Sequence, residues 1–164
     1  MDPRERLRQR YRPALVQLLF IGESPPASGR FFYQQDSGLY RAIRDAFRAV
    51  DPSITDECFL AVFQAQGCYL IDTCATPVDH LDARSRRAAC RANQAFLSHK
   101  ILELEPVGIV TLLRSIQPIV RRAVERADWR GPMLEVPYPG RWARHREVFL
   151  RALVPHLRVL LRSS

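Results

Sequence analysis

The chain has 164 residues, of which 47% are hydrophobic and 26% charged, a composition typical of one globular domain able to bury its own core. Its 25 basic and 17 acidic residues give a net charge of +8, which favours a polyanionic partner, although the near-exclusive use of arginine fits a GC-rich genome equally well. No apolar run approaches the ~20 residues of a membrane span, and the N-terminus lacks a signal-peptide core, so we expect a cytoplasmic protein with reduced cysteines and no membrane partner.

The N-terminal third combines a basic segment with a buried strand. Residues 3–14 have arginine at alternate positions and predict a short helix or arm, which is either a solvated leader or a contact for phosphate groups. The apolar run 16–21 predicts a buried strand ending at Gly22. Glu23 and Ser24 then fall at the carboxyl end of that strand, where open α/β sheets bind their ligands.

The loop after this strand contains two consecutive prolines. Pro25 and Pro26 fix φ and supply no N–H, and Pro25 favours an extended conformation for the residue before it. A stiff loop holds polar groups in place, whereas a simple strand-to-helix turn needs only a glycine and a cap. The loop therefore predicts a ligand site.

The next segment reads as two helices followed by a strand. Helical spacing of apolar residues predicts a helix at 37–50, stopped by Pro52, and Thr55 can cap a second helix. The apolar segment 68–71 predicts the second strand, with Asp72 at its carboxyl end.

The rest of the chain continues to alternate helices with strands. This alternation predicts a single α/β domain over residues 1–164, a three-layer αβα sandwich whose four-stranded parallel sheet is covered on both faces. The further predicted elements are a loop at 73–82, a long helix at 83–104, a strand at 108–113, a helix capped by Ser115 with Pro118 in its first turn, a short strand at 133–136 and a final helix at 143–162.

A motif at the first strand consists of Gly22-Glu23-Ser24-Pro25, then Phe31-Phe32-Tyr33, then Gly38 at the start of a helix. It resembles the first motif of the uracil-DNA glycosylase superfamily, and most closely the branch that carries Gly-Glu-x-Pro. The resemblance covers roughly residues 16–160. It implies the strand order 2-1-3-4, with the loops after strands one, two and four converging on one edge. It further implies a monomeric enzyme of base excision repair that removes uracil or another deaminated base from DNA by hydrolysing the N-glycosidic bond.

The resemblance assigns roles to four residues of this motif. Phe32 or Tyr33 would stack on the base, although either can instead belong to the core. Glu23 would orient water or offset oxocarbenium charge, and its alternative role is to accept hydrogen bonds from the loop backbone. Ser24 stands where some branches have Asp or Asn, and a serine is too weak a base to replace them unaided.

Two further positions depart from the family pattern. Asp72 stands where the superfamily usually has an Asn that reads uracil, and an ionised carboxylate only accepts hydrogen bonds, so it could accept from N3–H but not donate to O4. The family's His-Pro-Ser/Ala is here Val136-Pro137-Tyr138. Loss of one preorganised donor lowers a rate by roughly 100- to 1000-fold. The Tyr138 hydroxyl is a candidate substitute. A non-catalytic nucleic-acid- or nucleotide-binding protein on the same fold is therefore the alternative function.

Basic and aromatic residues near the predicted site are candidates for holding DNA. The residue that fills the vacated base stack would lie near Arg141 or Trp142, which can equally bind phosphate or pack. The predicted DNA-binding residues are Arg84, Arg87, Arg141, Trp142 and Arg144.

The cysteines do not form a complete metal set. Cys74 and Cys90 have a spacing similar to half of the iron–sulfur ligands of the Gly-Glu-x-Pro branch, but residues 1–57 lack the other half. Two thiolates do not hold a four-iron cluster, and a zinc site using His80 is no better supplied. We therefore expect core cysteines, with no metal and no cofactor.

Overall fold

Four parallel strands form the centre of the protein. A computed structural model describes residues 1–162. The strand order β2-β1-β3-β4 confirms the predicted α/β layout. The register places Gly22 at the end of β1 opposite Asp72 at the end of β2. The strands, each within two residues of its predicted bounds, are β1 Leu18–Gly22, β2 Cys68–Asp72, β3 Gly108–Thr111 and β4 Met133–Glu135.

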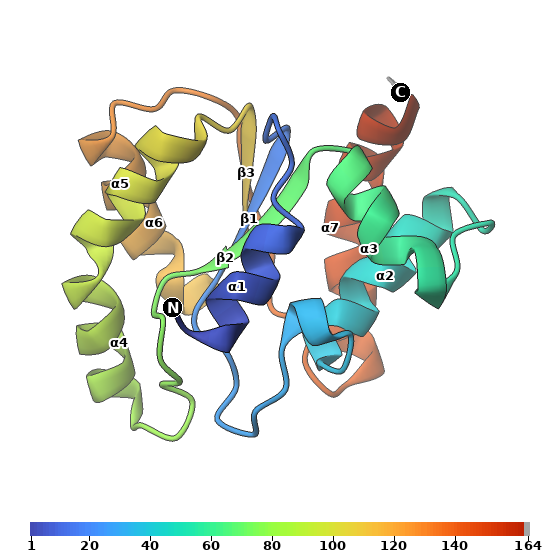
Figure 1. The fold of residues 1–164 in the computed structure, drawn as a ribbon. Coiled ribbons are helices and arrows are strands. Elements are labelled where there is room, and N and C mark those ends of the chain that lie inside the picture. The colour runs from blue at the N-terminus through green and yellow to red at the C-terminus, as the bar shows by residue number, and fades with distance from the viewer. Residues whose placement is uncertain (163–164) are drawn as a thin grey trace.

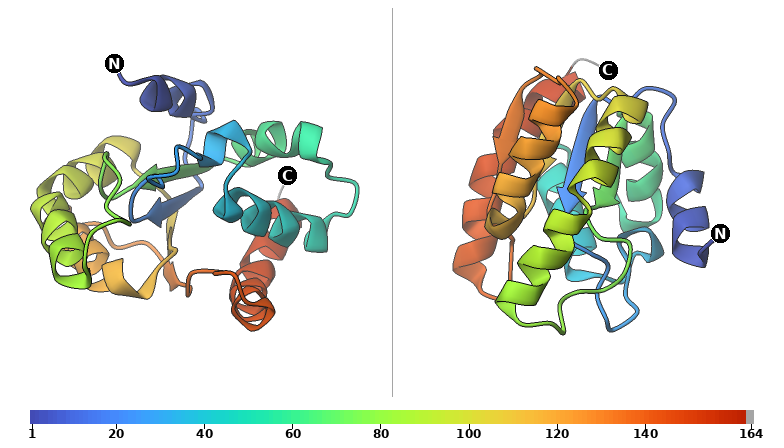
Figure 2. Two further views of the ribbon diagram at one scale, coloured as in Figure 1. Left: turned by 90° about the horizontal axis from the view of Figure 1, so that it is seen from below. Right: turned by 90° about the vertical axis from the view of Figure 1, so that its left-hand side faces the viewer.

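Helices cover both faces of this sheet (Figure 1). One layer contains α4, α5 and α6, and the other contains α2, α3 and α7, as the view from below shows (Figure 2). The first helix, α1, lies outside these layers, against the loop that follows β1. The helices are α1 Pro3–Arg10, α2 Gly38–Val50, α3 Asp56–Ala65, α4 Ala83–Ala92, α5 Gln94–Leu104, α6 Gln117–Arg126 and α7 Ala143–Arg162, with short 3-10 helices at Phe32–Gln34 and Arg114–Ile116.

Side-chain caps and one glycine explain several of these boundaries. The hydroxyls of Ser37 and Thr55 accept hydrogen bonds from backbone N–H groups in the first turns of α2 and α3, as expected for N-caps. Gly67 precedes β2 with φ +75°, and a Cβ there would lie 2.9 Å from the carbonyl oxygen of Leu15. Only glycine fits this position, because both the backbone conformation and the available space exclude a side chain.

Two predicted helix boundaries are wrong. The segment 83–104 is two helices rather than one, since the chain breaks at Asn93, whose side-chain amide donates to the carbonyl oxygen of Ala89 at 2.9 Å. An asparagine that binds nearby backbone competes with the helical ladder. Ser115 does not cap α6, because it lies inside the preceding 3-10 helix. Pro118 does occupy the first turn of α6, as predicted.

Buried aromatic rings occupy the space between the sheet and the α2–α3 layer. Phe32, Phe59 and Phe63 are each at most 3% exposed, and the Phe32 and Phe63 ring centroids lie 5.2 Å apart. This packing fixes the start of α2 and the loop before it against the sheet. Within residues 1–162, no helix combines the length and apolar character needed to cross a membrane.

Candidate functional site

A cavity of about 420 Å³ opens at the carboxyl edge of the sheet. Its size falls in the range of small-molecule binding sites, and its position is the one that parallel α/β sheets use for ligands. Residues that follow all four strands contribute to its wall. The charged, hydroxyl-bearing and aromatic residues of the lining include Glu23, Arg30, Phe31, Phe32, Asp72, Arg86, Tyr138 and Arg141.

The loops after β1 and β2 are held together by hydrogen bonds. The backbone N–H of Cys74 donates to the carbonyl oxygen of Glu23 at 2.8 Å, and that of Val78 donates to the Ser24 hydroxyl at 3.2 Å. The N–H of Ala27 donates to the Asp79 carboxylate at 3.0 Å. The two loops therefore form one stiff wall of the cavity. The Ser24 hydroxyl accepts one of the hydrogen bonds between them.

Glu23 presents its carboxylate at this wall. The side chain is 11% exposed and forms an ion pair with Arg86, which reaches it from α4. The hydrogen bond to Glu23 raises the pKa of Arg86. Because a charged donor holds the carboxylate from one side, Glu23 has a fixed position from which to act on a molecule in the cavity.

Phe32 and Tyr33, the two candidates for stacking on a base, have different contacts in the structure. Phe32 contributes to the cavity lining and Tyr33 does not, although both side chains are almost fully buried, with 3% and 2% exposed, and the Phe32 ring also packs in the core. The Tyr33 hydroxyl binds both backbone groups of Leu70, and its ring stacks on Tyr11 with centroids 5.6 Å apart. Tyr33 is therefore a core residue that fixes the loop to β2. Sequence reasoning missed Phe31, which also lines the cavity and whose signal was its place in the same aromatic run.

Asp72 lies at the cavity wall and has a partner that the sequence did not reveal. Its side chain is 8% exposed, and its Oδ2 accepts a hydrogen bond from Arg8 Nη2 at 2.8 Å. Burial raises the pKa of Asp72 to about 6, although Arg8 acts in the opposite direction. A Cβ at Gly22 would lie 2.9 Å from Asp72 Oδ1, so the glycine that ends β1 makes room for this carboxylate.

Arg8 brings the N-terminal helix to the site. Its guanidinium also pairs with Glu5 and lies 5.3 Å from the centroid of the Phe31 ring. Its Nε is buried without a hydrogen-bond partner in the described part of the chain. The predicted helix is present at Pro3–Arg10, and the ion pair of Arg8 with a buried carboxylate belongs to neither of its two predicted roles.

The segment after β4 supplies the opposite wall. Val136 is fully buried, and its N–H donates to the carbonyl oxygen of Thr111 at 2.9 Å, so it offers the cavity no donor. Tyr138 is 45% exposed and lines the cavity. The buried part of the side chain and the nearby carboxylates raise the pKa of Tyr138, so its hydroxyl stays protonated and can donate a hydrogen bond.

The predicted DNA-binding residues are all exposed, and one of them also lines the cavity. Arg141 lines the cavity itself, and Trp142 beside it is 71% exposed. Arg144 is exposed in the first turn of α7. Arg84 and Arg87 are exposed on α4, on either side of the inward-facing Arg86 in the sequence.

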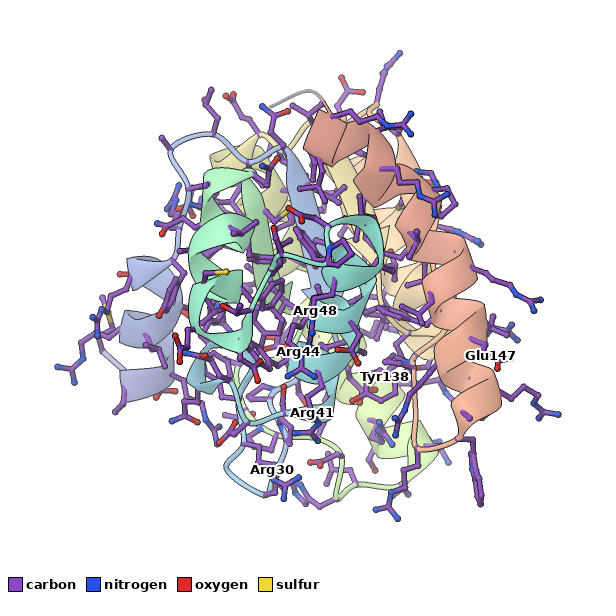
Figure 3. All side chains as sticks on the ribbon, turned by 90° about the vertical axis from the view of Figure 1, so that its right-hand side faces the viewer. Arg30, Arg41, Arg44, Arg48, Tyr138 and Glu147 are labelled. Carbon is purple, nitrogen blue, oxygen red and sulfur yellow. The ribbon has the colours of Figure 1, made fainter. Side chains whose placement is uncertain are left out.

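A second group of arginines was missed by sequence reasoning. Arg30, Arg41, Arg44 and Arg48 follow one another from the cavity loop along α2 (Figure 3). The signal was present, because positions 41, 44 and 48 lie on one face of a helix. Arg44 is paired with Asp56 at 2.6 Å, so the other three have the more available charges.

The described residues contain no metal centre. Within 1–162, no three His, Cys, Asp or Glu side chains come together as ligands. Cys74 and Cys90 do lie side by side, with their sulfur atoms 3.5 Å apart, while Cys58 and Cys68 belong to other elements. Comparison of the sequence with protein-family models and with curated proteins finds no match.

Proposed function

We propose that the cavity binds a base turned out of DNA and that the protein hydrolyses the N-glycosidic bond of uracil or another deaminated base. The observation that carries the proposal is the Glu23 carboxylate, fixed by Arg86 at a cavity that Phe31 and Phe32 also line. Base excision needs an anionic group near the sugar and an aromatic surface near the base. The net charge of +8 suits a DNA partner.

In this proposal Glu23 acts on the sugar. As the bond between C1′ and the base breaks, its electron pair leaves with the base and positive charge develops on the sugar. The carboxylate stabilises that charge and orients the water whose oxygen adds to C1′. The water loses a proton to the carboxylate, and the base anion takes up one proton, so that the products are a C1′ hydroxyl and the neutral base. Arg86 keeps the carboxylate in place through its ion pair with Glu23.

The departing base needs a donor, because it leaves with negative charge. Val136 supplies none, so the candidate donors are the Tyr138 hydroxyl and the Arg141 guanidinium, both of which line the cavity. A guanidinium is always protonated and donates through several N–H groups. Arg141 would therefore serve either the base or a neighbouring phosphate.

Two observations favour a second function, nucleotide or nucleic-acid binding without chemistry. Val136 is buried and offers no side-chain donor, and one oxygen of Asp72 is already taken by Arg8. A binding protein needs the aromatic surface and the arginines but not the positioned carboxylate.

Abasic-site formation on labelled oligonucleotides separates the two functions. Substrates carrying a single uracil, hypoxanthine or xanthine are incubated with the protein and then cleaved at abasic sites with alkali. We expect strand cleavage at one or more of these bases, and a loss of roughly 100-fold or more in rate for Glu23→Gln. DNA binding without excision of any of the three bases would instead support the second function.

A matched control tests whether any loss is local. Glu103 also pairs with basic side chains, Arg12 and Lys100, but it does not line the cavity. Glu103→Gln therefore removes a similar charge and similar ion pairs, and its excision rate should equal that of the unmodified protein. Equal losses in both variants would point to global destabilisation.

A further inference from the structure

Two thiols meet beside the candidate site. The sulfur atoms of Cys74 and Cys90 lie 3.5 Å apart, and the two residues are only 2% and 1% exposed. A disulfide bond is about 2.0 Å long, so the sulfurs must approach by only about 1.5 Å to form one. The other cysteines are placed differently: Cys58 binds Thr55 at the start of α3, and Cys68 is buried at the start of β2.

The pair connects two elements that build the cavity wall. Cys74 lies in the loop after β2, and its backbone N–H donates to the carbonyl oxygen of Glu23. Cys90 is the only buried residue of α4. Arg86, which holds the Glu23 carboxylate, lies one helical turn before Cys90 on the same face of α4. Movement of α4 toward Cys74 would therefore also move the partner of Glu23.

The surroundings give the two thiols different chemistry. The hydrogen bond with Cys90 lowers the pKa of Cys74, whereas the same contact, together with burial, raises the pKa of Cys90. The side-chain amide of Asn93 lies 3.8 Å from the Cys74 sulfur and can donate to it. A donor at this place stabilises a thiolate on Cys74, which makes Cys74 the nucleophile of the pair and Cys90 the thiol that attacks second.

We propose that Cys74 and Cys90 form a reversible disulfide when the protein meets a small hydroperoxide, and that this bond ties α4 to the loop after β2. The Cys74 thiolate attacks the peroxide, the O–O bond breaks, and an alcohol or water leaves as Cys74 becomes a sulfenic acid. The Cys90 sulfur then attacks the Cys74 sulfur and displaces water. In total two thiols lose two electrons and two protons, and the peroxide is reduced to an alcohol (or water) and one water.

Mass spectrometry of the full chain tests the covalent site directly. The reduced protein is treated with hydrogen peroxide, unfolded and alkylated. We expect two alkylated cysteines instead of four, and a proteolytic fragment that joins the Cys74 and Cys90 peptides and separates on reduction. Cys74→Ser and Cys90→Ser should abolish this fragment, while the double variant Cys58→Ser/Cys68→Ser should retain it. Oxidation that leaves Cys74 and Cys90 unlinked, whether as sulfinic acids or as thiols, would overturn the proposal.

Thermal unfolding measures the effect on the fold. The bond closes a loop between residues sixteen positions apart, which should raise the Tm of the oxidised protein by roughly 5–10 °C. Dithiothreitol should reverse the rise, and Cys90→Ser should show none. An oxidised, linked protein with an unchanged or lower Tm would show that the bond does not stabilise the contact between α4 and the loop.

The effect on excision rests on the proposed function. Because the bond pulls on the helix that carries Arg86, the oxidised protein should excise a base more slowly than the reduced one, by roughly tenfold or more. Equal rates in the linked and reduced forms would overturn the coupling to Glu23. Absence of excision in both forms would overturn the proposed function instead, while the mass and Tm measurements still decide the disulfide.

Discussion

At the scale of single residues, Asp72 holds a charge where little water reaches it. Its side chain lines the cavity and also forms an ion pair with Arg8. Replacing Asp72 by asparagine therefore changes two things, the hydrogen bonds offered to a base and the neutralisation of a buried guanidinium. A base-preference experiment on Asp72→Asn is informative only beside a measurement of stability.

The raised pKa of Asp72 predicts a pH dependence of stability. The pKa is about 6 in the folded protein, against an ordinary value of 3.8, so protonation favours the folded state. This stabilisation of the folded state is fully present below pH 3.8, the ordinary pKa of the group, and is lost as the pH rises through about 6. Between pH 7 and pH 5 the free energy of unfolding should therefore rise by on the order of 1 kcal/mol more in the unmodified protein than in Asp72→Asn.

Urea unfolding of both proteins at pH 7 and pH 5 measures this difference. Every other titratable group is present in both proteins, so its contribution drops out of the comparison. Carboxylates with lowered pKa values, such as Asp56 and Asp82, titrate below this pH range. Identical pH profiles for the two proteins would contradict the burial of the Asp72 charge.

Tyr33 and Tyr138 allow a structural hydroxyl to be compared with an exposed one. The Tyr33 hydroxyl satisfies both the N–H and the carbonyl oxygen of Leu70, at 2.7 Å and 3.1 Å. Tyr33→Phe leaves these buried groups without the hydroxyl and should lower the free energy of unfolding by about 1–3 kcal/mol. Tyr138→Phe should change it by less than about 0.5 kcal/mol, because that side chain is 45% exposed. Equal effects in urea unfolding would argue against the structural role of Tyr33.

At the scale of secondary-structure elements, local sequence was enough for the sheet but not for the site. The apolar runs located β1, β2 and β3 because buried parallel strands are apolar over most of their length, whereas β4 is half-buried and ends in Glu135. The break at Asn93 was missed because the helical pattern continues through it, and only the contacts of its side chain show the break. Likewise, the sequence placed Glu23 and Asp72 at strand ends, but not their partners Arg86 and Arg8, since many arginines were equally available.

The attachment of α1 can be tested with a double-mutant cycle. α1 has no buried residue, so Arg8 is a main anchor of this helix to the sheet edge. Arg8→Met leaves the Asp72 carboxylate buried without its cation and should lower the free energy of unfolding by about 3 kcal/mol. Adding Asp72→Asn should restore part of this loss, because no unpaired charge then remains. Strictly additive losses in chemical unfolding would show that the two side chains do not stabilise each other.

At the scale of the whole molecule, the basic residues that produce the net charge of +8 are not equally available to bind DNA. Some arginines are already paired with carboxylates, as Arg44 is with Asp56 and Arg121 with Glu135. An arginine whose charge is already balanced by a carboxylate neutralises a phosphate less and therefore displaces fewer of the cations condensed on DNA. Those that can contribute most to DNA binding are therefore exposed arginines, and two of them, Arg30 and Arg141, line the cavity. Arg84 and Arg87 on α4 and Arg144 on α7 are also exposed.

This distribution predicts which arginines set the salt dependence of DNA binding. For single strands, the slope of log K against log salt is about −0.7 for each phosphate neutralised. Arg30→Ala/Arg141→Ala should make the slope less negative by about 1.4 if each residue contacts one phosphate. Arg158→Ala/Arg162→Ala removes the same charge at the far end of α7, where the C-terminus lies (Figure 1), and should leave the slope unchanged. Fluorescence anisotropy of a labelled oligonucleotide at several salt concentrations gives both slopes. Equal slopes for the two double variants would mean that overall charge, rather than the cavity rim, attracts the DNA.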